Sequence, residues 1–229
     1  MQALQTANIA TFGTAQIAAL STDQLNAMRA TQIGVMTTSQ INALTSSQLA
    51  GMRDSQVAAM NSQRMGSIDT SVLQNMTAGQ IQSMTTSQII GLIDTQLAAL
   101  GTAQIASMKA TQIKAIETRD LSGLTTGQMV ALTSTQVGAF STNQLAALSA
   151  EQLAAVETQD MLALSAKQMA TLSASQVAGL STTQVNNLRP HQIAALTTDA
   201  VAAMTDAQLQ AMTSQQMGAL KTTQIQAMT

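Results

Sequence analysis

Apolar residues recur along this chain with a period of eight. Every eighth residue from Leu4 to Met228 is Leu, Met, Ile, Val or Phe, and every eighth residue from Ile9 to Ile225 is Ile, Leu, Val or Met. We number this eight-residue unit, or octad, so that these two apolar residues occupy positions eight and five. No insertion or deletion shifts the frame, which predicts a tandem-repeat architecture.

The spacing of the two apolar positions favours a helix. Residues three apart share one side of a helix but lie on opposite faces of a strand. The abundant Ala, Leu, Met and Gln are good helix formers. In one continuous helix, however, the apolar stripe would rotate by about 80° per octad. The helix must therefore restart in every octad.

The signal for the restart is the pair of polar residues at positions one and four. Position one is Ser, Thr, Asp or Asn at 18 of 29 places, and position four is Gln at 22 of 28. Ser or Thr followed three residues later by Gln is a capping box, in which each side chain satisfies the backbone N–H of the other residue. Pro190, the only proline, falls at position two, the first helical residue, where its missing N–H costs nothing.

These short helices must stabilise one another, because an isolated helix of eight residues is marginal in water. We therefore expect an all-α solenoid with positions five and eight inward, the 16 methionines as core filler, and an exterior rich in Thr, Ser and Gln. The uninterrupted frame predicts a single continuous solenoid over residues 1–229.

A longer period of forty residues lies over the octads. It divides the repeat into blocks of five octads at 21–60, 61–100, 101–140, 141–180 and 181–220. Two explanations are open: five octads form one superhelical turn, or a forty-residue unit was duplicated. Departures from the usual octad residues recur at this spacing. Asp120 and Asp160 replace Gln at position four, and Glu117 and Glu157 stand at position one. If their octads stack, these four carboxylates could gather around a hard cation; otherwise they belong to two solvated first turns.

Composition argues against several functions. Aromatic residues make up 1% of the chain and the net charge is −2, which leaves neither a stacking platform nor a basic face for nucleic acid. Cysteine is absent, and His191, the only histidine, has no partner at metal-ligand spacing. No nucleophile, base and orienting group cluster, so we expect no enzyme, no cofactor and no resident metal. No signal peptide or membrane span is visible.

The octad TTxQIxAL resembles the Thr/Gln/Leu-rich octapeptide-repeat arrays of very large secreted bacterial proteins of the adhesin-like or haemagglutinin-like type. The resemblance covers essentially the whole chain. It implies a structural role at the bacterial surface or outside the cell, with export directed by a signal outside this segment. Glycine- and aspartate-rich nonapeptides that bind calcium are absent, so calcium-driven folding is not implied.

Two functions from different classes remain. The first is a structural module, such as a spacer, a stalk or a filament-forming segment. The alternative is a solenoid scaffold that binds a protein, a glycan or an ordered surface. The repeat also has no polar terminal octads of the kind that usually close a solenoid core. We therefore expect end-to-end self-association through four apolar residues near the termini: Leu4, Phe12, Ile225 and Met228.

Overall fold

A computed structural model describes residues 5–228, which contain 28 short helices and no strand. The predicted all-α repeat fold is confirmed. The chain forms two compact units, which divide between Ile116 and Glu117. The prediction of one continuous solenoid over the whole chain stays a prediction, and each unit is described by itself.

Every helix has four to six residues and occupies one octad. The first unit contains α1 (Thr6–Ile9), α2 (Thr14–Ala18), α3 (Thr22–Asn26), α4 (Ala30–Gly34), α5 (Thr38–Asn42), α6 (Ser46–Gly51), α7 (Asp54–Val57), the 3-10 helix η1 (Ser62–Ser67), α8 (Thr70–Asn75), α9 (Ala78–Ser83), α10 (Thr86–Ile90), α11 (Asp94–Ala99), α12 (Thr102–Ser107) and α13 (Ala110–Ala115). The second contains the 3-10 helix η2 (Thr118–Gly123), α14 (Thr126–Val130), α15 (Ser134–Ala139), α16 (Thr142–Ala147), α17 (Ala150–Ala154), α18 (Thr158–Met161), α19 (Ala166–Met169), α20 (Ala174–Ala178), α21 (Thr182–Asn187), α22 (Pro190–Ala195), α23 (Thr198–Ala202), α24 (Asp206–Ala211), α25 (Ser214–Ala219) and α26 (Thr222–Gln226).

The helix restarts where the sequence predicts. Between α11 and α12, Leu100 at position eight has φ −65° and ψ 140°, and Gly101 at position one has φ −70° and ψ 155°. These two extended residues turn the chain between helices. Within residues 5–228 no residue has a positive φ, so the turn needs no glycine.

The capping boxes also form as predicted. In α10 the Thr85 hydroxyl accepts a hydrogen bond from the Gln88 N–H at 3.2 Å, and the Gln88 Oε1 accepts one from the Thr85 N–H at 2.8 Å. Pro190 is the first residue of α22. Most octads therefore carry their own helix-start signal, which helps to define such short helices.

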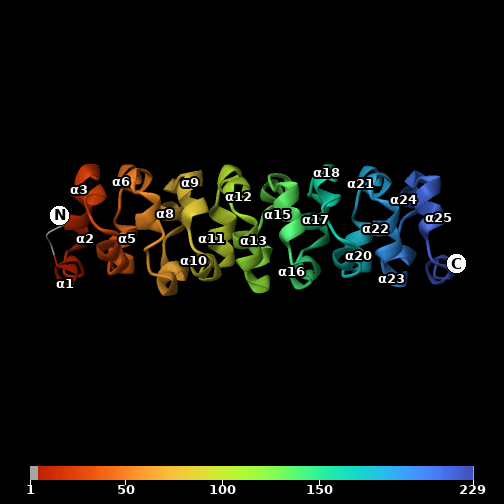
Figure 1. Cartoon of the computed structure of the whole chain (residues 1–229), viewed down its shortest axis with the longest axis horizontal. Coiled ribbons are helices and arrows are strands. Elements are labelled where there is room, and N and C mark those ends of the chain that lie inside the picture. The colour runs from red at the N-terminus through yellow and green to blue at the C-terminus, as the bar shows by residue number, and fades with distance from the viewer. Residues whose placement is uncertain (1–4, 229) are drawn as a thin grey trace. The chain divides into compact units, whose positions relative to one another are not determined.

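Helices pack against the helix three octads away. Within the first unit α9 contacts α12 and α10 contacts α13; within the second, α19 contacts α22 and α22 contacts α25. In Figure 1 α3, α6, α9 and α12 follow one another along the same edge of the first unit. Side-chain hydrogen bonds described below join octads that are four apart. A superhelical turn therefore contains between three and four octads, and the explanation of the forty-residue period as one turn of five octads is wrong.

Octad 85–92 shows which positions form the core. Ile89 at position five and Leu92 at position eight are buried, while positions one to three are exposed. Gln88 at position four is buried as well. The expectation of a Gln-rich exterior is therefore wrong for position four, because the amide lies between successive turns and finds its hydrogen-bond partners there.

Candidate functional site

The most distinctive polar groups inside each unit are the glutamines at position four. While the Gln88 Oε1 accepts from Thr85, its Nε2 donates to the carbonyl of Val57 at 2.8 Å and to that of Met60 at 2.9 Å. Val57 and Met60 are positions five and eight of the octad four octads earlier. One amide thus accepts a backbone N–H at the start of its own helix and donates to backbone carbonyls at the end of a helix in the preceding turn.

The same arrangement recurs in both units, and we call it the glutamine ladder. Its members donate to one or both carbonyls of the octad four octads earlier: Gln40, Gln48, Gln56, Gln80, Gln88, Gln96, Gln104 and Gln112 in the first unit, and Gln152, Gln168, Gln176, Gln184, Gln192, Gln208, Gln216 and Gln224 in the second. All of them are at most 8% exposed. A buried amide is unfavourable unless it is hydrogen-bonded, so the ladder strongly specifies how successive turns stack.

Arg64 interrupts the ladder in the first unit. Its Nη1 donates to the carbonyl of Met36 at 2.6 Å, which keeps the bond to position eight four octads earlier. A guanidinium has no acceptor atom, so Arg64 cannot receive the N–H of Asn61. The Asn61 side chain instead accepts from the Gln63 N–H at 2.9 Å, and the octad forms the 3-10 helix η1.

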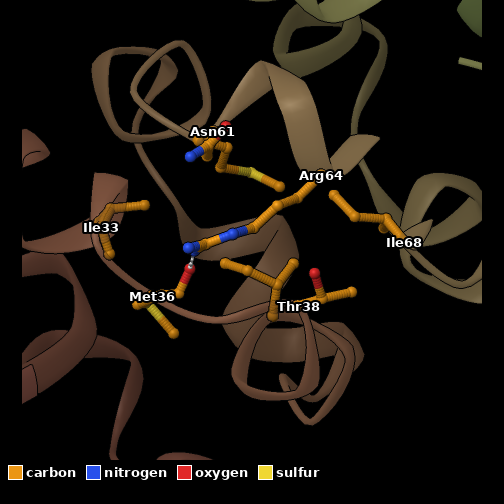
Figure 2. A pocket seen from close by; sticks show the side chains of 8 residues that line it. Ile33, Met36, Thr38, Asn61, Arg64 and Ile68 are labelled. Carbon is orange, nitrogen blue, oxygen red and sulfur yellow. Dashed lines mark hydrogen bonds between the residues drawn. The ribbon is translucent and has the colours of Figure 1, made fainter. Parts of the chain in front are cut away.

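A small pocket lies beside Arg64 (Figure 2). It contains about 220 Å³ of empty space, including open solvent at its mouth, and is lined by Ile33, Met36, Thr38, Ile41, Met60, Asn61, Arg64 and Ile68. Figure 2 shows the Arg64 side chain extending from η1 toward Met36 across this space. Only about 10 Å³ of this space is open to the centre of a water-sized molecule, which is far too little for a typical ligand site. It lies where Arg64 stands at position four in place of the usual glutamine.

Asp120 also replaces a ladder glutamine, in η2 of the second unit. Its carboxylate is buried and lies 3.4 Å from the Nε of Arg119, which also pairs with Glu117. A carboxylate accepts hydrogen bonds but cannot donate them, so Asp120 cannot form the ladder bond. Arg119 supplies the charge that compensates these two acids.

Asp160 is buried in α18 and accepts a hydrogen bond from the hydroxyl of Ser134, while Glu157 at the start of the same octad is exposed. Among the residues that the structure describes, no three His, Asp or Glu side chains form a group that could hold a metal ion. The proposed cation cluster of Glu117, Asp120, Glu157 and Asp160 is therefore not assembled. Octads in contact are three or four apart, whereas these two octads are five apart.

The repeat also matches a known protein family. Residues 1–30, 113–150, 153–190 and 193–229, more than half of the chain, match the family model described as the ALTTAQ repeat. The chain belongs to the ALTTAQ repeat family. Stretches such as ALTSTQ at 131–136 place this motif on positions seven, eight and one to four of the octad. No curated protein matches the chain.

The ALTTAQ matches also bear on the forty-residue period. Those starting at residues 113, 153 and 193 are forty residues apart. Contacts in each unit nevertheless recur at three and four octads. The forty-residue interval is therefore a period of the sequence, as a duplicated unit would produce, and is not a period of the packing.

The predicted association residues of this ALTTAQ chain have different surroundings. Leu4 lies outside the described residues. Phe12 and Met228 are half-buried, and Ile225 is 50% exposed although most other position-five residues form the core. Apolar surface is therefore exposed at Ile225, and end-to-end association stays a prediction.

Two titratable side chains lie in the first turns of helices in the second unit. His191 is exposed in the first turn of α22. The pKa of the exposed Glu151 carboxyl is lowered, first because its own backbone N–H donates to it and then because the Ser149 hydroxyl does. This acid stabilises the first turn of α17, as expected for a negative charge at a helix start. Within residues 5–228, no helix is long and apolar enough to span a membrane.

Sequence reasoning missed the second role of the position-four glutamines. The signal was present, because Glu serves a capping box as well as Gln but never occupies position four in this chain. The preference for Gln over Glu indicates that the NH₂ group, which a carboxylate lacks, has a partner of its own.

Proposed function

We propose that this ALTTAQ repeat chain is a non-enzymatic structural module, a spacer, stalk or filament-forming segment of a secreted or surface-exposed bacterial protein. The observation that supports this function most directly is the glutamine ladder. The same pair of interactions, within one octad and across one turn, recurs through each unit. Such an arrangement can be lengthened by adding octads without altering the contacts of the existing ones.

The energetics of a ladder fit this role. Each octad interacts with octads three and four away, so the stability of the array is approximately a sum of local and near-neighbour contributions. Each buried amide bond contributes about 1 kcal/mol net. The same bonds strongly disfavour any shift between turns, because a shift would leave both the amide and the carbonyls unpaired.

Octad deletions test the spacer function. Removing the octad 173–180, or the two octads 165–180, should leave helix content per residue unchanged and reduce the maximum dimension in solution scattering by equal steps. Removing only residues 173–176 displaces positions five and eight and should destabilise the second unit markedly. Equal damage from the octad and half-octad deletions would contradict the proposal.

The surface location is supported by the resemblance of the octad to secreted bacterial arrays. Antibodies against residues 117–229 should label intact cells that produce the protein. Labelling only after the cells are permeabilised would exclude this location and leave the spacer function intact.

The alternative function, a binding scaffold, is favoured by one local observation. Ile90 and Ile93 are 46% and 41% exposed in neighbouring octads, beside the irregular helix η1. Isoleucine methyl NMR spectra recorded with a library of short apolar peptides test this alternative. Saturable shifts confined to the methyl groups of these two residues would favour the scaffold. The control variant Val130→Thr, which removes an exposed apolar side chain elsewhere, should leave these shifts unchanged.

A further inference from the structure

The pocket beside Arg64 carries a positive charge that has no counter-charge. The half-buried guanidinium donates from its Nη1 to the Met36 carbonyl at 2.6 Å, and its remaining N–H groups bond to no acceptor among residues 5–228. No carboxylate in this range forms an ion pair with Arg64, whereas Arg119 of the second unit pairs with Glu117 and Asp120. A charge that is partly removed from water is unfavourable unless a counter-charge accompanies it.

The other polar side chains that line the pocket also offer donors. The Asn61 Oδ1 accepts from the Gln63 N–H at 2.9 Å, which leaves the NH₂ group of Asn61 available as a donor. The Thr38 hydroxyl donates to no residue in the described part of the chain. In Figure 2 the Arg64 side chain runs between Asn61 and Thr38 toward Met36. Three side chains with unused donors therefore line one small space.

The size of the space limits what can enter it. About 10 Å³ is open to the centre of a water-sized molecule, which corresponds to roughly one such molecule. Much of the remaining wall is apolar, from residues such as Ile33, Ile41 and Ile68. An occupant must therefore be about as small as water and must accept hydrogen bonds.

A monatomic anion meets both conditions better than water does. Water must also place its own hydrogens on acceptors, and the Oδ1 of Asn61 is already occupied by the Gln63 N–H. A halide ion accepts hydrogen bonds from every direction and supplies the missing counter-charge of Arg64. Larger anions such as acetate do not fit into the space for one water-sized particle.

We propose that this pocket binds a single halide ion, with chloride as its ordinary occupant. The Arg64 guanidinium supplies a charge-assisted hydrogen bond, which is roughly twice as strong as a neutral one. The NH₂ group of Asn61 and the hydroxyl of Thr38 complete the donors. A ladder glutamine carries no charge, so the site belongs to this octad and is separate from the spacer function proposed above.

The line width of the chloride NMR signal tests the proposal on the full chain. Chloride that exchanges between water and a protein site relaxes faster, so the excess line width reports binding. Sodium chloride is titrated at constant sodium concentration, with acetate as the balancing anion. The test variant is Arg64→Gln. The matched control is Arg53→Gln, because Arg53 lies in the same unit and also donates to a carbonyl, that of Met28 at 2.9 Å, but does not line the pocket.

Wild type and the Arg53→Gln control should show an excess line width that saturates with chloride. Bromide should remove it, whereas acetate should not. Arg64→Gln should bind chloride at least about tenfold more weakly, because the charge-assisted bond is lost. Thr38→Val keeps the charge and a similar shape, and should weaken binding by a smaller factor. Circular dichroism checks that each variant retains its helix content.

A wild type without a saturable excess line width would overturn the proposal. The same holds if Arg64→Gln binds like the control, or if acetate displaces chloride as well as bromide does, since attraction to any exposed positive charge would then explain the signal. If Arg64→Gln does not fold, Thr38→Val decides, and unchanged chloride binding in that variant would exclude the pocket as the site.

Discussion

Octads 85–92 and 61–68 lie in the same unit and pack against each other, and they carry different side chains at position four, Gln88 and Arg64. Gln88 closes the cap of its own α-helix and donates to two carbonyls of the preceding turn. Arg64 keeps one such bond, loses the cap bond and lies in a 3-10 helix beside a pocket. An amide fits both tasks because it is the side-chain group that combines an acceptor with two donors.

Loss of the amide does not by itself change the helix type. Val72 and Ala200 also replace the glutamine, and their octads form the α-helices α8 and α23. Arg64 and Asp120, by contrast, lie in the two 3-10 helices. Asp160 is also charged and lies in the α-helix α18, so neither loss of the amide nor a charge at position four determines the helix type by itself.

The largest effect is expected for Gln88→Glu. The carboxylate keeps the cap acceptor but removes both donors and places charge beside the carbonyls of Val57 and Met60. The free energy of unfolding should fall by about 4 kcal/mol. Urea denaturation followed by circular dichroism measures the loss, and hydrogen exchange should locate it in the first unit. Gln74→Glu, an exposed control, should change stability by less than about 0.5 kcal/mol; equal effects would refute the role given to the ladder.

A second substitution tests the packing between the two octads. A Cβ at Gly91 would lie 2.6 Å from the carbonyl oxygen of Ser62 and 3.0 Å from the Met65 Cβ. Gly91→Ala should therefore destabilise the chain by about 2 kcal/mol through overpacking. Gly79→Ala, where the nearest such atom is 3.9 Å away, should be neutral or stabilising by about 0.5 kcal/mol. Thermal unfolding of the two variants measures both effects. A stabilising effect of Gly91→Ala would show that η1 and α10 are not held so close.

The caps of the two octads provide a smaller test. Thr85 caps α10 through the Gln88 N–H, and Asn61 caps η1 through the Gln63 N–H. Replacing either residue with Ala should cost about 1 kcal/mol. Denaturation midpoints should therefore shift similarly in both variants. If Thr85→Ala lowered the free energy of unfolding several times more than Asn61→Ala, capping and the ladder bond would be strongly coupled.

The smallest expected effect comes from repairing the irregular octad. Arg64→Gln supplies the missing acceptor for Asn61 and two donors for the carbonyls of Ile33 and Met36. We expect stabilisation by about 0.5 kcal/mol, since one existing bond is exchanged for the full ladder arrangement. Thermal unfolding measures the gain, and backbone NMR shifts should show residues 62–67 becoming α-helical. A loss of stability would show that the Arg64 bond to Met36 stabilises this octad more than the ladder bonds of a glutamine would.

Much of the local structure could be predicted from the sequence. Helix starts, the place of Pro190 and the burial of positions five and eight follow from side-chain chemistry within a single octad. Interactions between neighbours in sequence are encoded by residue type and spacing alone.

The arrangement of the turns was not predictable in the same way. The number of octads per turn depends on the rotation added at each pair of extended residues, which a repeat period does not specify. For this reason the forty-residue period suggested a carboxylate cluster around Asp120 and Asp160 that the packing does not assemble.

The sequence by itself determined the octad, its cap and the apolar side of each helix, because all three arise from contacts within eight residues. Only the tertiary structure decided where the glutamine NH₂ groups point. Their acceptors, 28 and 31 residues earlier, reach them only after the chain has completed a turn, as Gln176 reaches Leu148 and Leu145. The same side chain therefore has one role set by local spacing and another set by the geometry of the solenoid.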